Sequence, residues 1–198
     1  EIWSDIIPTG KADMVLSVEP LEAMRYRQFL CPGGWVVTST TPFVNIPNYP
    51  ETKSLLDDLA GIDNIVMVDT AHFARVAGNR RAQNMVTVGA ASPMLDFEED
   101  RMLNFVEKLF ARKGEKIVTV NQRAFRYGRA AGLFFRAAAE AGMQKTIALR
   151  LLNKFDPETI DAAHAPAWAN AINNDKEKME TVLAHEGHLP CSPVPVFA

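Results

Sequence analysis

Short apolar runs alternate with amphipathic segments over the first 80 residues of the chain. Apolar runs of four or five residues between turn residues are typical of strands buried on both faces of a parallel sheet. This pattern predicts strands at residues 14–18, 35–39 and 64–68. Apolar residues at helical spacing predict helices at residues 20–29, 51–60 and 71–77. Strands that alternate with helices favour a parallel α/β sheet.

Helical patterns occupy the next part of the chain. Residues 84–91 are small and apolar, so a helix there could approach a sheet or a second helix closely. Residues 97–111 predict an amphipathic helix. Four of its apolar side chains are expected to face inward: Met102, Phe105, Val106 and Leu109. The alanine-rich segment 117–141 predicts one long helix despite its two glycines.

The composition changes after Gly142. Residues 145–154 and 157–186 are helical by pattern, with Asp156-Pro157 as a plausible helix start. The last stretch, residues 189–198, carries three prolines and is expected to be an extended tail.

Together these elements predict the fold class. We expect an α/β fold, with a Rossmann-like three-layer domain and a mostly parallel sheet over residues 1–142. A helical extension with a proline-rich tail would follow over residues 143–198. A doubly wound domain usually opens with a strand and a tight glycine turn, and neither precedes Asp13. The chain also begins at Glu1 without a methionine, so we expect that the N-terminal part of the domain is missing.

Composition narrows the function class. The chain has 198 residues, a formal net charge of −3, 47% apolar residues and 23% charged residues, which is ordinary for a soluble protein. Without a Lys/Arg-rich run we expect no nucleic-acid partner. No apolar run approaches the roughly 20 residues of a membrane span, and no signal peptide is visible, so a cytoplasmic location is expected. The cysteines, Cys31 and Cys191, form no CxxC, which predicts no iron–sulfur cluster on this chain.

Polar residues follow the predicted strands, where ligands gather in parallel α/β sheets. Glu19 comes between a strand and a helix. It could cap that helix, because a carboxylate is favoured at a helix N-terminus, or it could contact a ligand. Asn45, Asn48 and Tyr49 lie in a loop that prolines stiffen. That loop could hold a partner chain or a polar ligand, or could pack only on its own domain.

A polar segment before residues 84–91 offers a second candidate group. The adjacent Arg80 and Arg81 could bind a phosphate or a carboxylate, although they could equally be solvated surface residues. Asn84 is a candidate ligand contact, and its simpler role is to cap a helix.

Two other groups have less support. His185, His188 and Cys191 are potential metal donors, but the histidine spacing differs from HExxH, so we expect no metal site. Asp69 and His72 could form an acid–base pair, but no serine or cysteine motif completes a triad. The sequence has no GxSxG, P-loop or GxGxxG motif. We therefore assign no catalytic residue.

Several motifs resemble one enzyme family. Residues 12–23 together with Pro32-Gly33-Gly34 resemble the gamma-type domain of the 2-oxoacid:ferredoxin oxidoreductases. The run TPFVNIPNYP, residues 41–50, is similar to the indolepyruvate-type members of that family. Further similarities bring the resemblance to about residues 4–130: Asn84–Ser92, Phe110–Gly114 and Asn121–Gly128.

The resemblance implies a function for the whole complex. Such complexes decarboxylate an arylpyruvate, such as indolepyruvate, with thiamine diphosphate, and they yield an aryl-acetyl-CoA and reduced ferredoxin. Thiamine diphosphate and the iron–sulfur clusters would belong to a partner alpha subunit, so this chain would carry no cofactor and would not be competent alone. Five of the polar candidates would then lie near the partner, the 2-oxoacid or CoA: Glu19, Asn45, Asn48, Arg80 and Asn84.

The chain departs from the family pattern in two ways. A glycine-rich opening, GxGGQG, and a later RGG segment should precede Glu1 and are missing. The helical part beyond residue 142 is longer than the core domain needs.

Three alternatives for the function stay open: a subunit acting on an aliphatic 2-oxoacid such as pyruvate, a non-catalytic scaffold or binding module of the same fold, and a stand-alone Rossmann enzyme that uses NAD.

Overall fold

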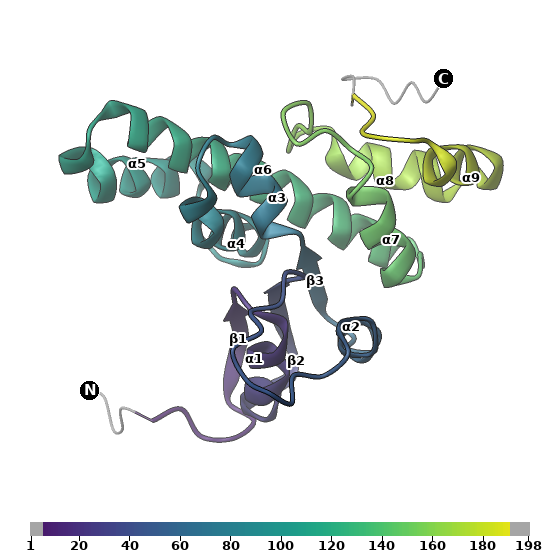
Figure 1. Cartoon of the computed structure of the whole chain (residues 1–198), viewed down its shortest axis with the longest axis horizontal. Coiled ribbons are helices and arrows are strands. Elements are labelled where there is room, and N and C mark those ends of the chain that lie inside the picture. The colour runs from purple at the N-terminus through teal and green to yellow at the C-terminus, as the bar shows by residue number, and fades with distance from the viewer. Residues whose placement is uncertain (1–5, 191–198) are drawn as a thin grey trace.

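A small parallel sheet forms one end of the protein. The computed structural model describes residues 6–190. The sheet contains β1 (Ala12–Ser17), β2 (Leu30–Ser39) and β3 (Ile65–Val68), paired in the order β1-β2-β3 (Figure 1). The register aligns Val15 with Val36, and Val36 with Ile65. The predicted parallel α/β fold is confirmed.

Helices cover both faces of this sheet. All four residues of β3 are buried, as are the last four of β2, although successive side chains point to opposite faces. Helices α1 (Pro20–Tyr26) and α2 (Thr52–Ala60) connect the strands, and α1 packs on β1 and β2. Helix α4 (Gln83–Ala91) contacts all three strands, and α6 (Glu115–Glu140) packs on β3. This is the layered arrangement of a Rossmann-like domain.

The start of β2 differs from the prediction. We expected Pro32-Gly33-Gly34 to separate a helix from a strand that begins at Trp35. The strand instead begins at Leu30. Its register with β1 shifts: Ala12 pairs with Leu30, but Met14, two residues later, pairs with Trp35. The extra residues form an irregularity within the strand, and Gly33 there has φ of 81°. A glycine tolerates this left-handed conformation inside a bulged strand.

The long helix α6 organises the rest of the core. It packs along α4, and glycines stand where the two backbones meet. A Cβ added at Gly128 would lie 2.8 Å from the carbonyl carbon of Val86 and closer still to its oxygen. Gly89 on α4 is equally close to the Phe125 carbonyl, and Gly132 on α6 to that of Ala90. The prediction of close approach by the small residues 84–91 is therefore confirmed.

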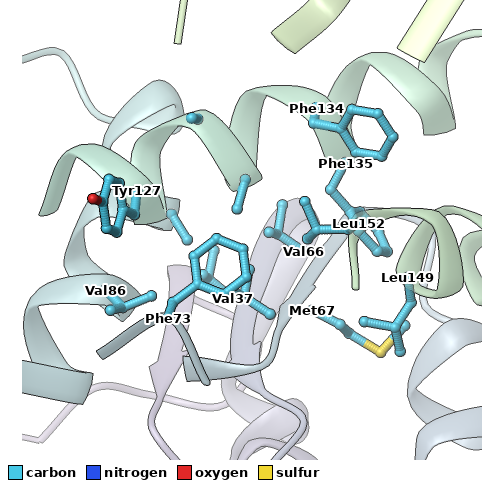
Figure 2. Packing of buried hydrophobic residues seen from close by; sticks show 14 of the residues in the cluster. Val37, Val66, Met67, Phe73, Val86, Tyr127, Phe134, Phe135, Leu149 and Leu152 are labelled. Carbon is cyan, nitrogen blue, oxygen red and sulfur yellow. The ribbon is translucent and has the colours of Figure 1, made fainter. Parts of the chain in front are cut away.

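The apolar core extends from the sheet to the C-terminal helices. Figure 2 shows Val37 and Val66 of the sheet beside Phe73, and Phe134 and Phe135 of α6 near Leu152. Trp168 is buried near Phe155, whose ring meets that of Phe134 edge to face. The C-terminal helices thus share one core with the sheet. The domain boundary at residue 142 stays a prediction.

The remaining helices all follow β3 in the chain (Figure 1). They are α3 (Thr70–Val76), α5 (Glu99–Phe110), α7 (Lys145–Leu152), α8 (Ala165–Asn173) and α9 (Lys176–Ala184). No helix within residues 6–190 has both the length and the hydropathy that crossing a bilayer requires.

The prediction of continuous helix over residues 157–186 is wrong. The backbone forms turns after α7, where the Asp161 carboxylate accepts a hydrogen bond from the Ala163 N–H. Pro166 lies in the first turn of α8, where a proline favours helix initiation. Asp175 then caps α9. Local caps and a proline therefore divide a segment whose apolar spacing alone suggested one element.

The inward orientation predicted for α5 is also only partly correct. Leu103 and Val106 are buried, whereas Phe105 is 58% and Leu109 66% exposed. Helix α5 packs mainly along α6, so only one narrow side of it is covered. An amphipathic pattern identifies the apolar side chains of a helix but does not show whether a neighbour covers all of them.

Candidate functional site

A cavity of about 560 Å³ opens at the carboxyl ends of the strands. Its walls are the end of β1 with α1, the loop of residues 41–50 after β2, and the start of α4. The lining includes four of the five residues proposed from the sequence: Glu19, Asn45, Arg80 and Asn84. Asn48 belongs to the same loop but does not line the cavity. A contact between any of these residues and a ligand or partner stays a prediction.

Glu19 joins the end of β1 to the loop across the cavity. One carboxylate oxygen accepts a hydrogen bond from the backbone N–H of Glu22 at 2.8 Å, so Glu19 caps α1. The other oxygen accepts from the Tyr49 hydroxyl and from the backbone N–H of Phe43, the latter at 3.4 Å. The capping role of Glu19 is confirmed, and the same carboxylate also holds the proline-rich loop in place.

Tyr49 is the main side-chain link between the loop and Glu19. Burial of the hydroxyl raises the pKa of Tyr49, and its hydrogen bond to Glu19 and the nearby carboxylate charge raise it further. The phenol therefore stays protonated and remains a donor. The sequence marked Tyr49 as part of a stiff loop but not as the partner of Glu19, which lies 30 residues earlier.

A second polar network anchors the base of the loop. The buried hydroxyls of Ser39 and Thr70 are 2.7 Å apart, and Ser39 Oγ accepts from the Thr41 N–H at 3.0 Å. The Thr41 hydroxyl donates to Asp69, 3.2 Å away. Sequence reasoning missed this network. The available signal was that polar residues end both β2 and β3, whose carboxyl ends lie side by side in a parallel sheet.

Asp69 and His72 do not form the acid–base pair considered from the sequence. The Asp69 carboxylate accepts from the backbone N–H of His72 at 2.9 Å, which is the geometry of a helix cap. The imidazole of His72 stacks on that of His188, with ring centroids 4.8 Å apart. The Asp69 carboxylate therefore contacts the backbone of His72 and not its imidazole.

The start of α4 brings two arginines to the cavity wall. Asn79 caps the turn that leads into α4 by accepting from the Arg81 N–H at 2.9 Å. The capping role predicted for Asn84 is therefore wrong, because Asn84 is the second residue of α4. Its amide side chain lines the cavity instead. Arg80 and Arg81 are exposed, and neither forms an ion pair with any residue from 6 to 190.

Some charged side chains around the cavity have a partner within the chain and others have none among residues 6–190. Arg25 pairs with Glu22 at 3.0 Å, and Glu19 is occupied by its hydrogen-bond donors. Arg80 and Arg81 keep their guanidinium groups available. Paired guanidinium groups suit carboxylate or phosphate oxygens, so this wall can receive an anionic group.

The possible metal donors are not brought together by the part of the chain that the structure describes. Among residues 6–190, no three His, Cys, Asp or Glu side chains are grouped to hold a metal ion. His188 faces His72 through its ring, and Cys191 lies outside the described residues. The sequence motif formed by His185, His188 and Cys191 therefore gains no support from the described geometry.

Comparison with known proteins identifies relatives of the chain. The family model described as pyruvate ferredoxin/flavodoxin oxidoreductase matches residues 1–131. This range includes the sheet, the cavity and α4, and it ends within α6. No solved structure matches the chain.

Three archaeal relatives carry the same name, indolepyruvate oxidoreductase subunit IorB. The protein from Thermococcus kodakarensis is 31% identical over 139 residues, which are 65% of this chain and 67% of the relative. That from Pyrococcus horikoshii is 30% identical, with the same two coverages. That from Methanothermobacter thermautotrophicus is 32% identical over 71% of this chain and 72% of the relative.

Proposed function

The chain belongs to the pyruvate ferredoxin/flavodoxin oxidoreductase family, and from this premise we propose that it is a subunit of a 2-oxoacid:ferredoxin oxidoreductase. The family match over residues 1–131 carries this proposal. Its relatives are named as subunits, which supports a role inside a complex. We expect that the chain is not catalytically competent alone.

The proposed reaction is the oxidative decarboxylation of an arylpyruvate, and the proposed substrate is indolepyruvate. The 2-oxoacid loses CO₂, its acyl group forms a thioester with CoA, and two electrons pass to ferredoxin. Thiamine diphosphate would supply the decarboxylation chemistry from a partner alpha subunit that also carries the iron–sulfur clusters. The names of the relatives support indolepyruvate. The family description favours pyruvate as the second candidate substrate.

Within this complex the chain would contribute a binding surface. Arg80 and Arg81 would attract the carboxylate of the 2-oxoacid or a phosphate of CoA, while Asn84 supplies an amide to the same cavity. The loop beside them carries Phe43 and Val44, which are 68% and 67% exposed. Because prolines and Glu19 already order this loop, it would lose little conformational entropy when a partner binds it.

Reconstitution with a thiamine-diphosphate subunit tests the proposal. The complex should reduce ferredoxin in a CoA-dependent reaction with indolepyruvate, and pyruvate in a parallel assay decides between the two substrates. Replacing Arg80 and Arg81 with alanine should lower kcat/KM at least tenfold, since a hydrogen bond to a charged group contributes roughly 1.5–3 kcal/mol. Asn45→Ala with Asn48→Ala should weaken assembly or turnover.

Two exposed arginines elsewhere provide the control. Arg123→Ala with Arg126→Ala removes the same charge from α6, outside the cavity, and should leave kcat/KM unchanged. A wild-type chain that neither assembles with such a subunit nor supports turnover would favour a scaffold role. Binding of NAD by the isolated chain would instead favour a stand-alone Rossmann enzyme.

A further inference from the structure

Helix α5 carries a second surface, away from the strand-end cavity. Solvent reaches three large apolar side chains of this surface: Phe105 and Leu109 of α5 are 58% and 66% exposed, and Phe97, just before the helix, is 52% exposed. These residues border an apolar groove of about 450 Å³ whose floor includes Met85, Phe125 and other side chains of α4 and α6. Isolated exposed apolar residues are common, but several around one groove indicate a binding surface.

Two cations lie over the aromatic rings of this surface. The guanidinium of Arg101 is 5.9 Å from the centroid of the Phe97 ring, and the ammonium of Lys108 is 5.4 Å from that of Phe105. Neither cation forms an ion pair with the residues that the structure describes. Both therefore remain available to a carboxylate that approaches the groove.

The carboxylates of α5 lie on other sides of the helix. Glu99 pairs with Arg129 of α6 at 2.8 Å, on the covered side. At 3.6 residues per turn, Asp100 and Glu107 project from the side away from Phe105 and Leu109. The exposed sector of α5 is therefore apolar and positively charged, whereas Asp96 and Glu98 flank Phe97 before the helix begins.

We propose that this groove, lined by Phe97, Arg101, Phe105 and Leu109 and with Lys108 beside the Phe105 ring, docks an acidic amphipathic helix of the partner subunit. The proposal rests on the proposed function, because it requires that partner. A helix can place apolar side chains at spacings of three and four residues into such a groove. Carboxylates beside that apolar stripe would meet Arg101 and Lys108, which gives the contact its charge complementarity.

A second copy of this chain is a poorer occupant. In a two-fold symmetric dimer the same patch would face itself, so the cations on one copy would approach those on the other. Like charges brought together at an interface are unfavourable. Figure 1 shows α5 at the opposite end of the helical layer from α9, so the surface is also clear of the C-terminal helices.

The affinity of the chain for the reconstituted partner subunit tests this surface. Calorimetric titration should show binding at least tenfold weaker for Phe105→Ser, because an aromatic anchor in a groove usually dominates such a contact. Lys108→Glu should also weaken binding and reduce its dependence on salt. Glu107→Gln, an exposed change on the side of α5 away from Phe105 and Leu109, should leave the affinity unchanged.

The outcomes separate this proposal from the function on which it rests. If wild-type chain and partner bind and turn over 2-oxoacid but both α5 variants bind as tightly as wild type, the groove proposal is overturned and the function stands. If wild-type chain does not bind the partner at all, the proposed function fails first. Sedimentation showing a dimer of the chain alone that Phe105→Ser dissociates would assign the groove to a second copy and would overturn the proposal. Thermal unfolding of each variant confirms that it is folded.

Discussion

The contact between α4 and α6 and the strand-end cavity share one helix but are built in opposite ways. Where α4 packs against α6 it presents small residues such as Gly89, so the two backbones are in contact. A larger side chain has no room there. At its first turn the same helix presents Gln83 and Asn84 to a cavity, and Arg81 lies in the turn just before it, so long polar side chains have space there. The first arrangement gives stability, and the second leaves groups available to a ligand.

This difference separates residues that specify the fold from residues that offer a function. The small residues of the helix contact cannot be exchanged without moving a backbone, because protein interiors are close-packed. The cavity wall has exposed cations whose removal leaves no cavity in the core and no buried partner unpaired. Stability measurements should therefore respond to one end of α4, and activity measurements to the other.

Gly128→Ala is the strongest test of the close-packed side. The new Cβ would overlap the Val86 carbonyl, which is backbone and cannot rotate away. We expect a loss of about 3 kcal/mol in the free energy of unfolding, at the upper end of the cost of overpacking a core. Urea denaturation of the variant measures it. Gly61→Ala, at a helix end with φ of −73° and no backbone of another element nearby, should change stability by less than about 0.5 kcal/mol.

If Gly128→Ala were as stable as wild type, the helices would have to separate freely, and the contrast between the two ends of α4 would disappear. The Gly61→Ala variant shows whether replacing any glycine with alanine lowers the free energy of unfolding. Both variants should unfold in a single transition if the C-terminal helices and the sheet share one core.

Much of this contrast could be predicted from sequence, but only where local patterns decide it. The apolar runs located the strands, and the small residues at 84–91 indicated close helix packing. Strand-end position pointed to Glu19 and Asn45, because parallel strands end at one edge of the sheet, whereas Arg80 and Asn84 were candidates through their residue types. These features depend on periodicity and on composition within one or two elements.

The features that were missed depend on neighbours far apart in the chain. The link between Tyr49 and Glu19 and the contact between Ser39 and Thr70 exist only once the strands pair. The exposure of Phe105 depends on which helix lies beside α5, and amphipathicity does not report that. The division of residues 157–186 depended on caps such as Asp175, which are weak signals beside a continuous apolar pattern.

Glu19→Ala sharpens the comparison on the cavity side. The change removes the cap of α1, which is worth about 1 kcal/mol, and the acceptor for Tyr49, worth about 1 kcal/mol more. We expect a loss of about 2 kcal/mol in the free energy of unfolding, less than for Gly128→Ala. Proteolysis of the native protein should also become faster in residues 41–50, because the loop loses its anchor.

Glu19→Gln is the matched control, since its amide oxygen keeps one acceptor and the side chain keeps its size. It should lose about half as much stability as Glu19→Ala. Equal proteolysis of the loop in wild type and in Glu19→Ala would show that the prolines alone order it, and Glu19 would then be only a helix cap.

His72 should give the smallest effect, through pH. Burial lowers the pKa of His72, and the adjacent His188 lowers it further, so the folded protein favours the neutral imidazole. The unfolded chain then binds more protons below pH of about 6.5, the ordinary histidine value. Stability should therefore decline as pH falls below that value and level off below the folded pKa of His72.

Urea denaturation at several pH values measures this decline, and His72→Gln should make it shallower. His164→Gln is the control, because that histidine precedes α8 and contacts Asp161 at 3.3 Å, so its removal should not abolish the decline. An unchanged slope in His72→Gln would mean that the stacked histidines contribute nothing to the acid response. The close-packed contact of α4 with α6 has no titrating group at its glycines, so Gly128→Ala should lower stability equally at every pH in the same series.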